Sequence, residues 1–310
     1  MVQKNSIKPK IVCIGGPTGV GKTRLAITLA NLFDGEIVSC DSIAIYKHLN
    51  IGSAKPTQEE QQQAKHYLID IREPFEEFSV AEYMQEAKKV ISDILSRGKL
   101  PIVVGGTGLY MKGLLFSLDL GHTDKSEEIR EKYNQILAEK GGEYLLEKLR
   151  QIDPISAEKL HEKDVNRIVR ALEIFELTGK RKSDIKTELK SEYDYKLILL
   201  TDDRKVLYDR INLRVDKMLE MGLEDEVRGL IENNKLTRDN QSMSGIGYKE
   251  FFDYFDGKIS REELIYQIKQ NSRHYAKRQL TWFKAMPNVE MYDCNKMQVI
   301  VENVKSFLGK

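Results

Sequence analysis

Short apolar runs alternate with amphipathic segments through the N-terminal part of the chain. The runs IVCIG (11–15), GEIVSCDS (35–42) and LPIVVGG (100–106) have the length and composition of buried strands. A helical pattern follows the first run as far as about Leu32, and another begins near Ser79. Nearly continuous apolar strands separated by helices are typical of a parallel sheet covered on both faces. The pattern therefore predicts an α/β fold.

The helix near Ser79 has clear start and stop signals. Ser79 and Glu82 have the spacing of a capping box, in which each side chain accepts from the other residue's backbone N–H. Apolar residues then recur at helical spacing as far as Ile94, and Gly98 follows. Because glycine adopts the backbone conformation that ends helices, we expect this helix to stop there.

Residues 121–193 have a different pattern, with charged helices and no strand signal. In DVNRIVRALEIFELTGK (164–180) apolar residues recur at helical spacing before a glycine stop at Gly179. The apolar run YKLILLT (195–201) and the amphipathic segment 203–222 then resume the earlier pattern. The simplest topology is a sheet core formed by 1–120 and 194–310, with an all-helical insertion at 121–193.

Composition narrows the class of protein. The chain has 310 residues, 41% hydrophobic and 31% charged, which suits a folded globular protein with room for a second module. No apolar run approaches the length of a membrane helix, and the N-terminus lacks a signal core, so we expect a cytoplasmic protein without a membrane partner. Cys13, Cys40 and Cys294 have neither metal-site nor disulfide spacing and are interpreted as reduced, buried thiols.

The net charge of +1 excludes a uniformly basic nucleic-acid binder, but the charge is unevenly distributed. Between Leu264 and Met286 there is no acidic residue, and five basic residues fall there. The stretch NSRHYAKRQLTWFK (271–284) mixes basic with aromatic side chains, as contacts to phosphate and stacked bases require. The alternative is a basic surface helix whose aromatics belong to the core, which we favour for Trp282 and Phe283.

The stretch GGPTGVGKT (15–23) carries the clearest chemistry. It matches the phosphate loop, whose backbone N–H groups and lysine bind phosphate oxygens while a Thr hydroxyl binds Mg²⁺. A strand leads into it and a helix follows, so the helix N-terminus also faces the anion. It predicts a P-loop NTPase-like core and a diphosphate-binding set made of Gly16, Pro17, Thr18, Gly19, Val20, Gly21, Lys22 and Thr23. Such a loop can serve ATP hydrolysis or phosphoryl transfer, or hold a phosphorylated molecule that reacts elsewhere.

Acidic residues near this loop are few. An ATPase of this class places an Asp at the end of an apolar strand for Mg²⁺, yet LPIVV is followed by Gly105, Gly106 and Thr107. Asp41 is the acid that a strand delivers to the edge where the phosphate loop must lie. It could bind a metal-bound water, accept a proton, or cap a following helix. The glycines around Thr107 allow either a close backbone approach or a tight turn.

Arg210 and Arg214 lie one helical turn apart, where like charges repel unless an anion neutralises them. A bound diphosphate would do so. Pairing with Asp203, Asp209 or Asp216 is the alternative, and from these residues alone we favour this solvated ion-pair face.

Together these stretches resemble the tRNA dimethylallyltransferase (tRNA isopentenyltransferase) family. The resemblance covers nearly the whole chain, in the family's order, through GPTGVGKT, EIVSCDSIAIYKHLNIGSAKP, HYLIDIREPFEEFSVAEY, LPIVVGGTGLY, DVNRIVRALEIFELTGK, RINLRVDKMLEMGLEDEV, SGIGYKE and AKRQLTWFK. The second of these strings is highly characteristic. The form it resembles is the bacterial one, without the C-terminal zinc finger of eukaryotic members.

The resemblance implies a reaction. The family transfers a dimethylallyl group from dimethylallyl diphosphate to N6 of the adenosine 3′-adjacent to the anticodon in tRNA, releasing diphosphate. The phosphate loop with Lys22, Mg²⁺ bound with Thr23, and an arginine from the Arg210/Arg214 pair would neutralise the leaving diphosphate. Asp41 would accept the proton of the N6 amine, with Thr107 near the reacting groups. An adenine in a stacked anticodon loop must first be flipped out.

The resemblance also implies the tRNA contacts. They fall on Asp41, Ser42, Ile43, Ala44, Thr107, Arg130, Asn166, Arg167, Ile168, Val169 and Arg170, and the basic stretch adds Lys277 and Arg278. The expected partners are the tRNA anticodon stem-loop and dimethylallyl diphosphate, and the family implies a monomer.

Two other classes remain open from the residues. One is a small-molecule enzyme, either a kinase using ATP or an adenylate isopentenyltransferase, and the other is a non-catalytic nucleotide-dependent RNA-binding protein. The helical insertion and the basic-aromatic stretch favour a macromolecular acceptor. The lack of an acid after LPIVVGG disfavours ATP hydrolysis.

Overall fold

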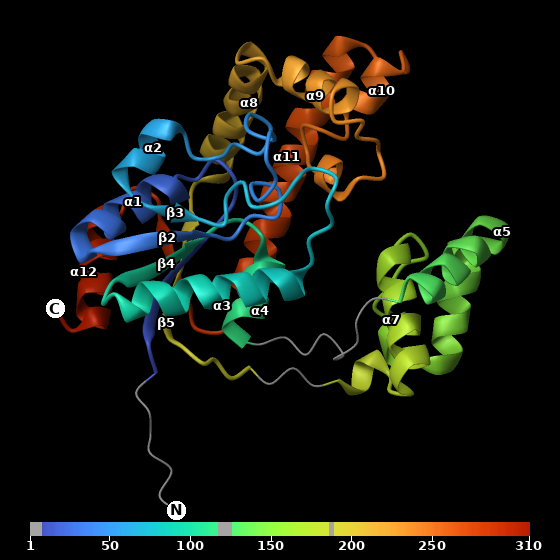
Figure 1. The fold of residues 1–310 in the computed structure, drawn as a ribbon, viewed down its shortest axis with the longest axis horizontal. Coiled ribbons are helices and arrows are strands. Elements are labelled where there is room, and N and C mark those ends of the chain that lie inside the picture. Colours follow the sequence, from blue (N-terminus) through green and yellow to red (C-terminus); the bar gives the residue numbers. More distant parts are fainter. Residues whose placement is uncertain (1–7, 117–125, 186–188) are drawn as a thin grey trace, which may run out of the picture. The chain divides into compact units, whose positions relative to one another are not determined.

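A computed structural model describes residues 8–116, 126–185 and 189–310. The chain divides into two compact units, one formed by Met1–Phe116 with Lys190–Lys310 and the other by Ser117–Leu189 (Figure 1). The predicted insertion, 121–193, overlaps most of the second unit, and its predicted start lies outside the described residues. Its predicted end at 193 directly precedes a strand that begins at Asp194.

The larger unit is built on a six-stranded parallel sheet with the order β3-β2-β4-β1-β5-β6 (Figure 1). The strands are β1 (Lys10–Gly15), β2 (Gly35–Ser39), β3 (His66–Tyr67), β4 (Leu100–Val104), β5 (Asp194–Thr201) and β6 (Val289–Asp293). The four predicted strands are confirmed as the centre of the sheet. The predicted α/β class, with a P-loop-like core flanked by helices, is confirmed with them.

Successive side chains of a strand point to opposite faces of this sheet, and each face has its own hydrophobic core. In β1, Ile11 and Cys13 belong to one hydrophobic cluster, whereas Val12 and Ile14 belong to another. All four are fully buried. A strand buried on both faces reads as a continuous apolar run, which explains why these strands were recognisable in the sequence.

Helices cover both faces of the sheet. Residues of α1 and α12 pack into the core that holds Val12, and residues of α3 and α4 pack into the core that holds Ile11. The helices of this unit are α1 (Lys22–Phe33), α2 (Gln58–Gln63), α3 (Val80–Ser96), α4 (Gly108–Phe116), α8 (Arg204–Glu220), α9 (Leu223–Glu232), the 3₁₀ turn η2 (Gln241–Ser244), α10 (Phe251–Phe255), α11 (Arg261–Lys284) and α12 (Met297–Leu308).

The predicted capping box at the start of α3 is confirmed. The Glu82 N–H donates to Ser79 Oγ at 3.2 Å, and the Ser79 N–H donates to Glu82 Oε2 at 2.8 Å. The helix ends before Gly98, which has a φ of 71°. The caps therefore fix both ends of α3 where the sequence predicted them.

The described residues of the second unit form helices joined by turns, and they have a core of their own. It contains α5 (Glu127–Ile152), α6 (Pro154–Ala157), α7 (Val165–Thr178) and the 3₁₀ turn η1 (Lys182–Asp184). Tyr133, Leu149 and Leu172 are fully buried in its centre. The helical path of α5 is broken at Gly141, and α7 ends at Gly179, as predicted.

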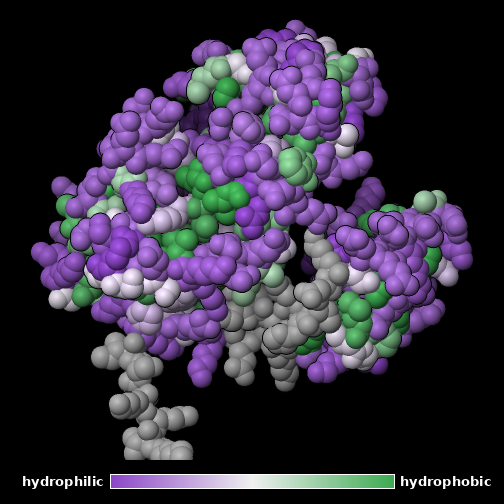
Figure 2. Space-filling view, viewed as in Figure 1, coloured by the Kyte–Doolittle hydropathy of each residue, from purple (hydrophilic) through white to green (hydrophobic). Residues whose placement is uncertain are grey.

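Hydrophilic residues cover most of the face seen in Figure 2, interrupted by smaller hydrophobic areas. Among the described residues, no helix has the length and apolar character needed to cross a bilayer. The three cysteines are free, as predicted. Cys13 and Cys40 are buried, also as predicted, whereas Cys294 lies half-buried after β6.

Candidate active site

The phosphate loop connects the end of β1 to the start of α1. Gly19 and Gly21 have φ angles of 78° and 95°, a backbone conformation that costs other residues energy. A side chain on Gly16 would bring its Cβ within 2.8 Å of the Leu200 carbonyl oxygen. The glycines thus let the loop fold tightly around the helix N-terminus, where backbone N–H groups are left to bind an anion.

Lys22 begins α1 and reaches back over the loop. Its Nζ donates to the Pro17 carbonyl oxygen at 2.8 Å. The pKa of Lys22 is lowered to about 8, mainly by burial and also by the positive charge of Arg214, while the negative charge of Asp41 opposes both. The three ionisable groups predicted for the site are therefore close enough to affect one another.

The two arginines of α8 have different surroundings. Arg214 Nη1 donates to Thr18 Oγ1 at 3.1 Å, and its Nη2 donates to the Ala54 carbonyl oxygen at 3.5 Å. Arg210 instead forms a 2.7 Å ion pair with Asp202. The structure thus joins Arg214, and not Arg210, to the phosphate loop. The favoured ion-pair interpretation was wrong for Arg214, and the partner of Arg210 was not among the acids considered.

Asp41 follows β2 and fulfils one of the roles considered for it, that of a cap. Its Oδ1 accepts from the backbone N–H groups of Ile43 at 2.9 Å and Ala44 at 3.2 Å, so the carboxylate caps the next segment. That segment, 42–45, is a turn and not the helix that was considered. The charge of Asp41 also raises the pKa of Lys22 against the larger effect of burial. Asp41 is therefore both a local cap and part of the electrostatics of the loop.

Thr107 joins the turn after β4 to the turn that Asp41 caps. Its Oγ1 accepts from the Ser42 N–H at 3.0 Å, and its own N–H donates to the Cys40 carbonyl oxygen at 3.2 Å. A Cβ on Gly105 would lie 2.0 Å from that same oxygen. The glycines beside Thr107 therefore serve close backbone approach, one of the two predicted reasons for them. Of the neighbouring predicted tRNA contacts, Ala44 is buried.

Gln279 is a site residue that the sequence analysis missed. Its Oε1 accepts from the Thr18 N–H at 3.0 Å, and its Nε2 donates to the Gly106 carbonyl oxygen at 3.0 Å. This buried side chain of α11 thereby ties the phosphate loop to the glycine turn after β4. The available signal was helical spacing, because Gln279 shares a face of α11 with the buried residues Ala276 and Phe283.

The aromatic residues of α11 differ in exposure. Phe283 is fully buried, as predicted, and occupies the space where a side chain on Gly15 would lie. Trp282 is 43% exposed and packs over Gly108, so the core interpretation was wrong for it. Burial, together with the charge of Asp41, raises the pKa of Tyr275 to about 12.

The predicted tRNA-contact residues of α7 have mixed surroundings. Ile168 and Val169 are buried in the core of the helical unit, so their side chains do not face a partner. Asn166 and Arg167 are exposed. The neighbouring Arg170 forms an ion pair with Glu173 at 2.6 Å.

Arg130 of α5 meets the same carboxylate. Its Nε donates to Glu173 Oε1 at 2.9 Å, and the Glu173 side chain is fully buried. Burial would raise the pKa of Glu173, but hydrogen bonds from Arg130, Arg170 and the Ser126 N–H outweigh it and bring the pKa to about 2. Sequence analysis missed Glu173 because it falls among the apolar residues of the helix. Arg130 and Arg170 thus both bind the Glu173 carboxylate within the protein, whether or not they also contact RNA.

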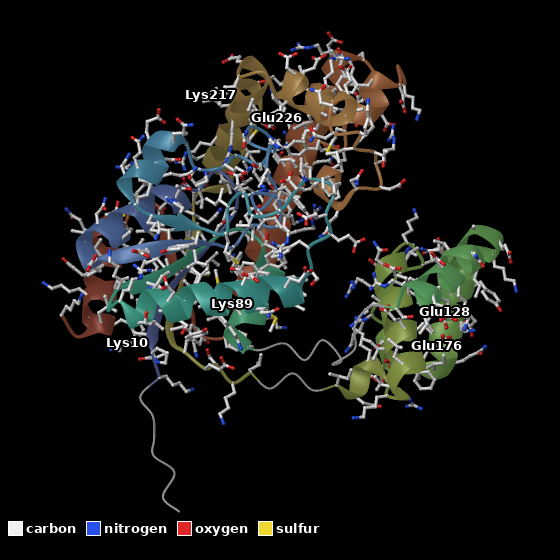
Figure 3. The ribbon with its side chains drawn as sticks, in the orientation of Figure 1. Lys10, Lys89, Glu128, Glu176, Lys217 and Glu226 are labelled. Atoms are coloured by element: carbon white, nitrogen blue, oxygen red, sulfur yellow. The ribbon has the colours of Figure 1, made fainter. Side chains whose placement is uncertain are left out.

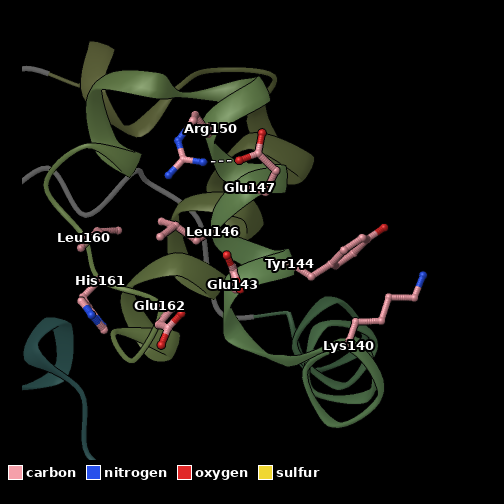
Figure 4. Close-up of a pocket in the computed structure, with 9 residues that line it drawn as sticks. All are labelled: Lys140, Glu143, Tyr144, Leu146, Glu147, Arg150, Leu160, His161 and Glu162. Atoms are coloured by element: carbon pink, nitrogen blue, oxygen red, sulfur yellow. Dashed lines mark hydrogen bonds and ion pairs between the residues drawn. The ribbon is translucent and has the colours of Figure 1, made fainter.

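Two cavities are lined by other residues. One, of about 520 Å³, belongs to the helical unit and is lined by Lys140, Tyr144, Arg150 and His161 among others (Figure 4). The other, of about 530 Å³, lies on α8 beside Tyr208 and Arg273. Neither is lined by a residue that the sequence predicted for the site.

The described part of the chain has no group of three or more His, Cys, Asp or Glu side chains arranged to hold a metal ion. A phosphate-loop cation does not need such a group, since a Thr hydroxyl, water and phosphate oxygens supply its ligands. Thr23 lies at the start of α1 beside Lys22. The donors at the loop thus fit Mg²⁺ bound together with a phosphorylated ligand.

Known proteins resemble this chain over nearly all its length. The IPP transferase family model matches residues 44–286. The tRNA dimethylallyltransferases of Bacillus cereus and Bacillus anthracis are each 48% identical over 307 residues, which is 98% of this chain and 96% of theirs. The solved tRNA isopentenylpyrophosphate transferase of Bacillus halodurans is 42% identical, with a TM-score of 0.74 and 97% of both chains covered. A eukaryotic dimethylallyltransferase solved while acting on tRNA is 31% identical, with a TM-score of 0.83, over 97% of this chain and 80% of that one.

Proposed function

This chain belongs to the IPP transferase family and prenylates tRNA, and from this premise we propose that its donor is dimethylallyl diphosphate. The acceptor is N6 of the adenosine 3′-adjacent to the anticodon, and diphosphate is released. The observation that carries this proposal is that Lys22, Arg214 and Asp41 come together at the phosphate loop. Arg214 donates to Thr18 of that loop, and the charges of Arg214 and Asp41 shift the pKa of Lys22 in opposite directions. Two cations suit a leaving diphosphate, and one carboxylate suits a proton acceptor.

The diphosphate lies in the phosphate loop. Backbone N–H groups of 16–23, Lys22 and Arg214 neutralise the oxygen that becomes an anion when the allylic carbon–oxygen bond breaks. Arg210 forms an ion pair with Asp202, so we assign the direct contact with diphosphate to Arg214 alone. When bound, Mg²⁺ held by Thr23 and the phosphate oxygens adds further positive charge at the leaving group.

Asp41 and Thr107 act on the acceptor. The N6 amine is a poor nucleophile while its lone pair is delocalised into the adenine ring, so a carboxylate that accepts its hydrogen bond aids attack. The new bond joins N6 to the terminal allylic carbon, the carbon–oxygen bond breaks, and the N6 proton passes to Asp41. Thr107, hydrogen-bonded to the Ser42 backbone, keeps the two turns of the site at a fixed distance.

The tRNA anticodon loop meets the protein through residues that remain exposed or half-exposed. On the larger unit these include Ser42, Ile43, Lys277 and Arg278, and on the helical unit Asn166 and Arg167. The adenosine leaves the stack to reach Asp41, because a stacked base cannot approach a diphosphate held in the loop.

A labelled-donor assay tests this function. The protein, Mg²⁺ and labelled dimethylallyl diphosphate are incubated with unmodified tRNA, with tRNA carrying guanosine 3′ of the anticodon, or with AMP or ATP. We expect label only in the unmodified tRNA with adenosine at that position. Label in AMP and none in tRNA would assign the chain to the adenylate isopentenyltransferases instead.

A further inference from the structure

Glu226, near the start of α9, binds the backbone of a loop far away in the sequence (labelled in Figure 3). Its Oε2 accepts from the N–H groups of Asn50 at 2.9 Å and Ile51 at 2.8 Å. Its Oε1 accepts from the Gly52 N–H at 3.1 Å. Three successive N–H groups therefore converge on one carboxylate.

Tyr248 completes this contact. Its hydroxyl donates to Glu226 Oε1 at 2.8 Å and accepts from the Ser53 N–H at 3.0 Å. Its ring lies against Gly52, where a Cβ would come within 2.6 Å of Tyr248 Cζ. Two side chains thus satisfy the four consecutive N–H groups of residues 50–53, which we call the anchored loop.

Successive backbone N–H groups that face one point form an anion-binding concavity. In the anchored loop the anion is built in, because the Glu226 carboxylate occupies it. Hydrogen bonds to an ionised acceptor are shorter and stronger than neutral ones, so this single side chain strongly restricts the loop. Removing it leaves three N–H donors without their partner.

The anchored loop is linked to the phosphate loop through Arg214. Ala54 follows it with a φ of 50°, and the Ala54 carbonyl oxygen accepts from Arg214 Nη2 at 3.5 Å. The other end of the same guanidinium donates to Thr18 Oγ1 at 3.1 Å. Arg214 is therefore held between the anchored loop and the phosphate loop.

We propose that Glu226 is a positioning residue that fixes Arg214 for diphosphate through the anchored loop. Its hydrogen bonds go to the anchored loop and to Tyr248, and it acts by keeping the Ala54 carbonyl where it orients the guanidinium. The proposal rests on the diphosphate role given above to the phosphate loop.

The first test compares Glu226→Ala with Glu224→Ala, its neighbour on α9, which pairs with the exposed Arg228. Affinity for inorganic diphosphate and KM for the prenyl donor are measured with kcat and melting temperature. We expect Glu226→Ala to weaken diphosphate binding and raise KM by roughly tenfold, with a smaller change in kcat. Glu224→Ala should match the wild type.

The response of diphosphate affinity to added formate distinguishes a positioning role of Glu226 from a merely structural one. Because the anchored loop binds a carboxylate, added formate should restore part of the diphosphate affinity of Glu226→Ala and leave the wild type unchanged. Glu226→Gln keeps the shape of the side chain but turns amide hydrogens toward N–H donors, so its diphosphate affinity should lie between those of the wild type and Glu226→Ala. This variant provides the measurement if Glu226→Ala does not fold. Loss of activity in step with melting temperature, without a response to formate, would overturn the proposal.

A double mutant separates this inference from the proposed function. If Glu226 acts through Arg214, adding Glu226→Ala to Arg214→Ala should weaken diphosphate binding no further, whereas independent roles would add. Additive losses would refute the inference and leave the proposed function standing. Wild-type protein that binds no diphosphate and prenylates no tRNA would refute the proposed function itself.

Discussion

At Asp41, one carboxylate oxygen serves the backbone while the charge of the group acts on the phosphate loop. These two roles can be separated, because the oxygen of an Asn side chain can still accept from the Ile43 and Ala44 N–H groups. Asp41→Asn should therefore keep the turn and lose the proton acceptor. We expect kcat to fall by about 10²–10⁴-fold with little change in tRNA affinity, measured by single-turnover transfer and equilibrium binding.

Asp41→Ala is the matched control. It removes the cap as well as the charge, so it should lower tRNA affinity and melting temperature in addition to kcat. If Asp41→Asn and wild type transferred the prenyl group at the same rate, Asp41 would be a structural cap alone.

Lys22 gives the site a dependence on pH. Its pKa of about 8 means that the ammonium needed for diphosphate binding loses its proton as the pH rises through that value. We expect kcat/KM for the prenyl donor to be constant well below pH 8 and to fall as the pH rises through that value, since kcat/KM reports the free enzyme. In Lys22→Arg the side chain stays charged, so its remaining activity should lack this decline. A wild-type profile that is flat to pH 9.5 or so would contradict the assignment.

The sequence could place Lys22, Asp41 and Thr107 because each belongs to a short motif at the end of a recognisable strand. It could not separate Arg210 from Arg214, since both lie on one helix face and their difference arises from Asp202 and Thr18 on other segments. Residues that act through distant backbone groups leave still less trace. Neither Gln279 nor Glu226 lies near its partners in the chain, so only the fold reveals what they bind.

Among the elements, burial decides what the sequence could predict. The central strands have two buried faces and stand out as apolar runs. The edge strands β3 and β6 were not predicted, because β3 has two residues and β6 has exposed and half-buried positions but no buried one. Such short or largely exposed strands are recognised only through the neighbours with which they pair.

Helix α11 presents two faces with separate tasks. Gln279 and Phe283 are buried beside the phosphate loop, while Lys277 and Arg278 are exposed. If the exposed face contacts tRNA phosphates, neutralising either basic residue to Gln should weaken binding and reduce the slope of log affinity against log salt by about one unit. The measurement is tRNA binding across a salt series, without the prenyl donor.

Arg261→Gln, at the start of the same helix, provides the control. Arg261 is 54% exposed and lies 3.8 Å from Glu224. Its replacement by Gln changes the net charge by the same amount as the replacement of Lys277 or Arg278. Its slope should remain that of the wild type. Equal slopes for all three variants would mean that Lys277 and Arg278 are ordinary surface charges.

For the molecule as a whole, the helical unit and the sheet unit have separate cores, and the helical one depends on a buried charge. The Glu173 pKa is depressed to about 2 from an ordinary value of 4.5, by hydrogen bonds that outweigh its burial. A depressed carboxyl pKa gives stability that is present above the unfolded value and is lost as the pH falls. The helical unit should therefore lose stability between about pH 4.5 and 2.

Amide hydrogen exchange in α7, followed between these pH values, measures this loss. Glu173→Gln should reduce the pH dependence, and Arg130→Met should lower the unfolding free energy at neutral pH by about 2 kcal/mol. Glu147→Gln, at an exposed ion pair with Arg150, should change neither. Exchange in Glu173→Gln that kept the wild-type pH dependence would assign the acid sensitivity to other groups.

The order of strands in the sheet also has a consequence for synthesis on the ribosome. β3, β2, β4 and β1 are adjacent in the sheet and are all translated before the helical unit. The edge of β1 that faces away from β4, however, pairs with Asp194–Leu199 of β5, which emerges only after that unit has been made. A nascent chain at this stage presents an open strand edge, the feature by which partly made proteins pair with one another. The self-contained core of the helical unit lets it fold during this interval, while β1 still awaits its partner strand.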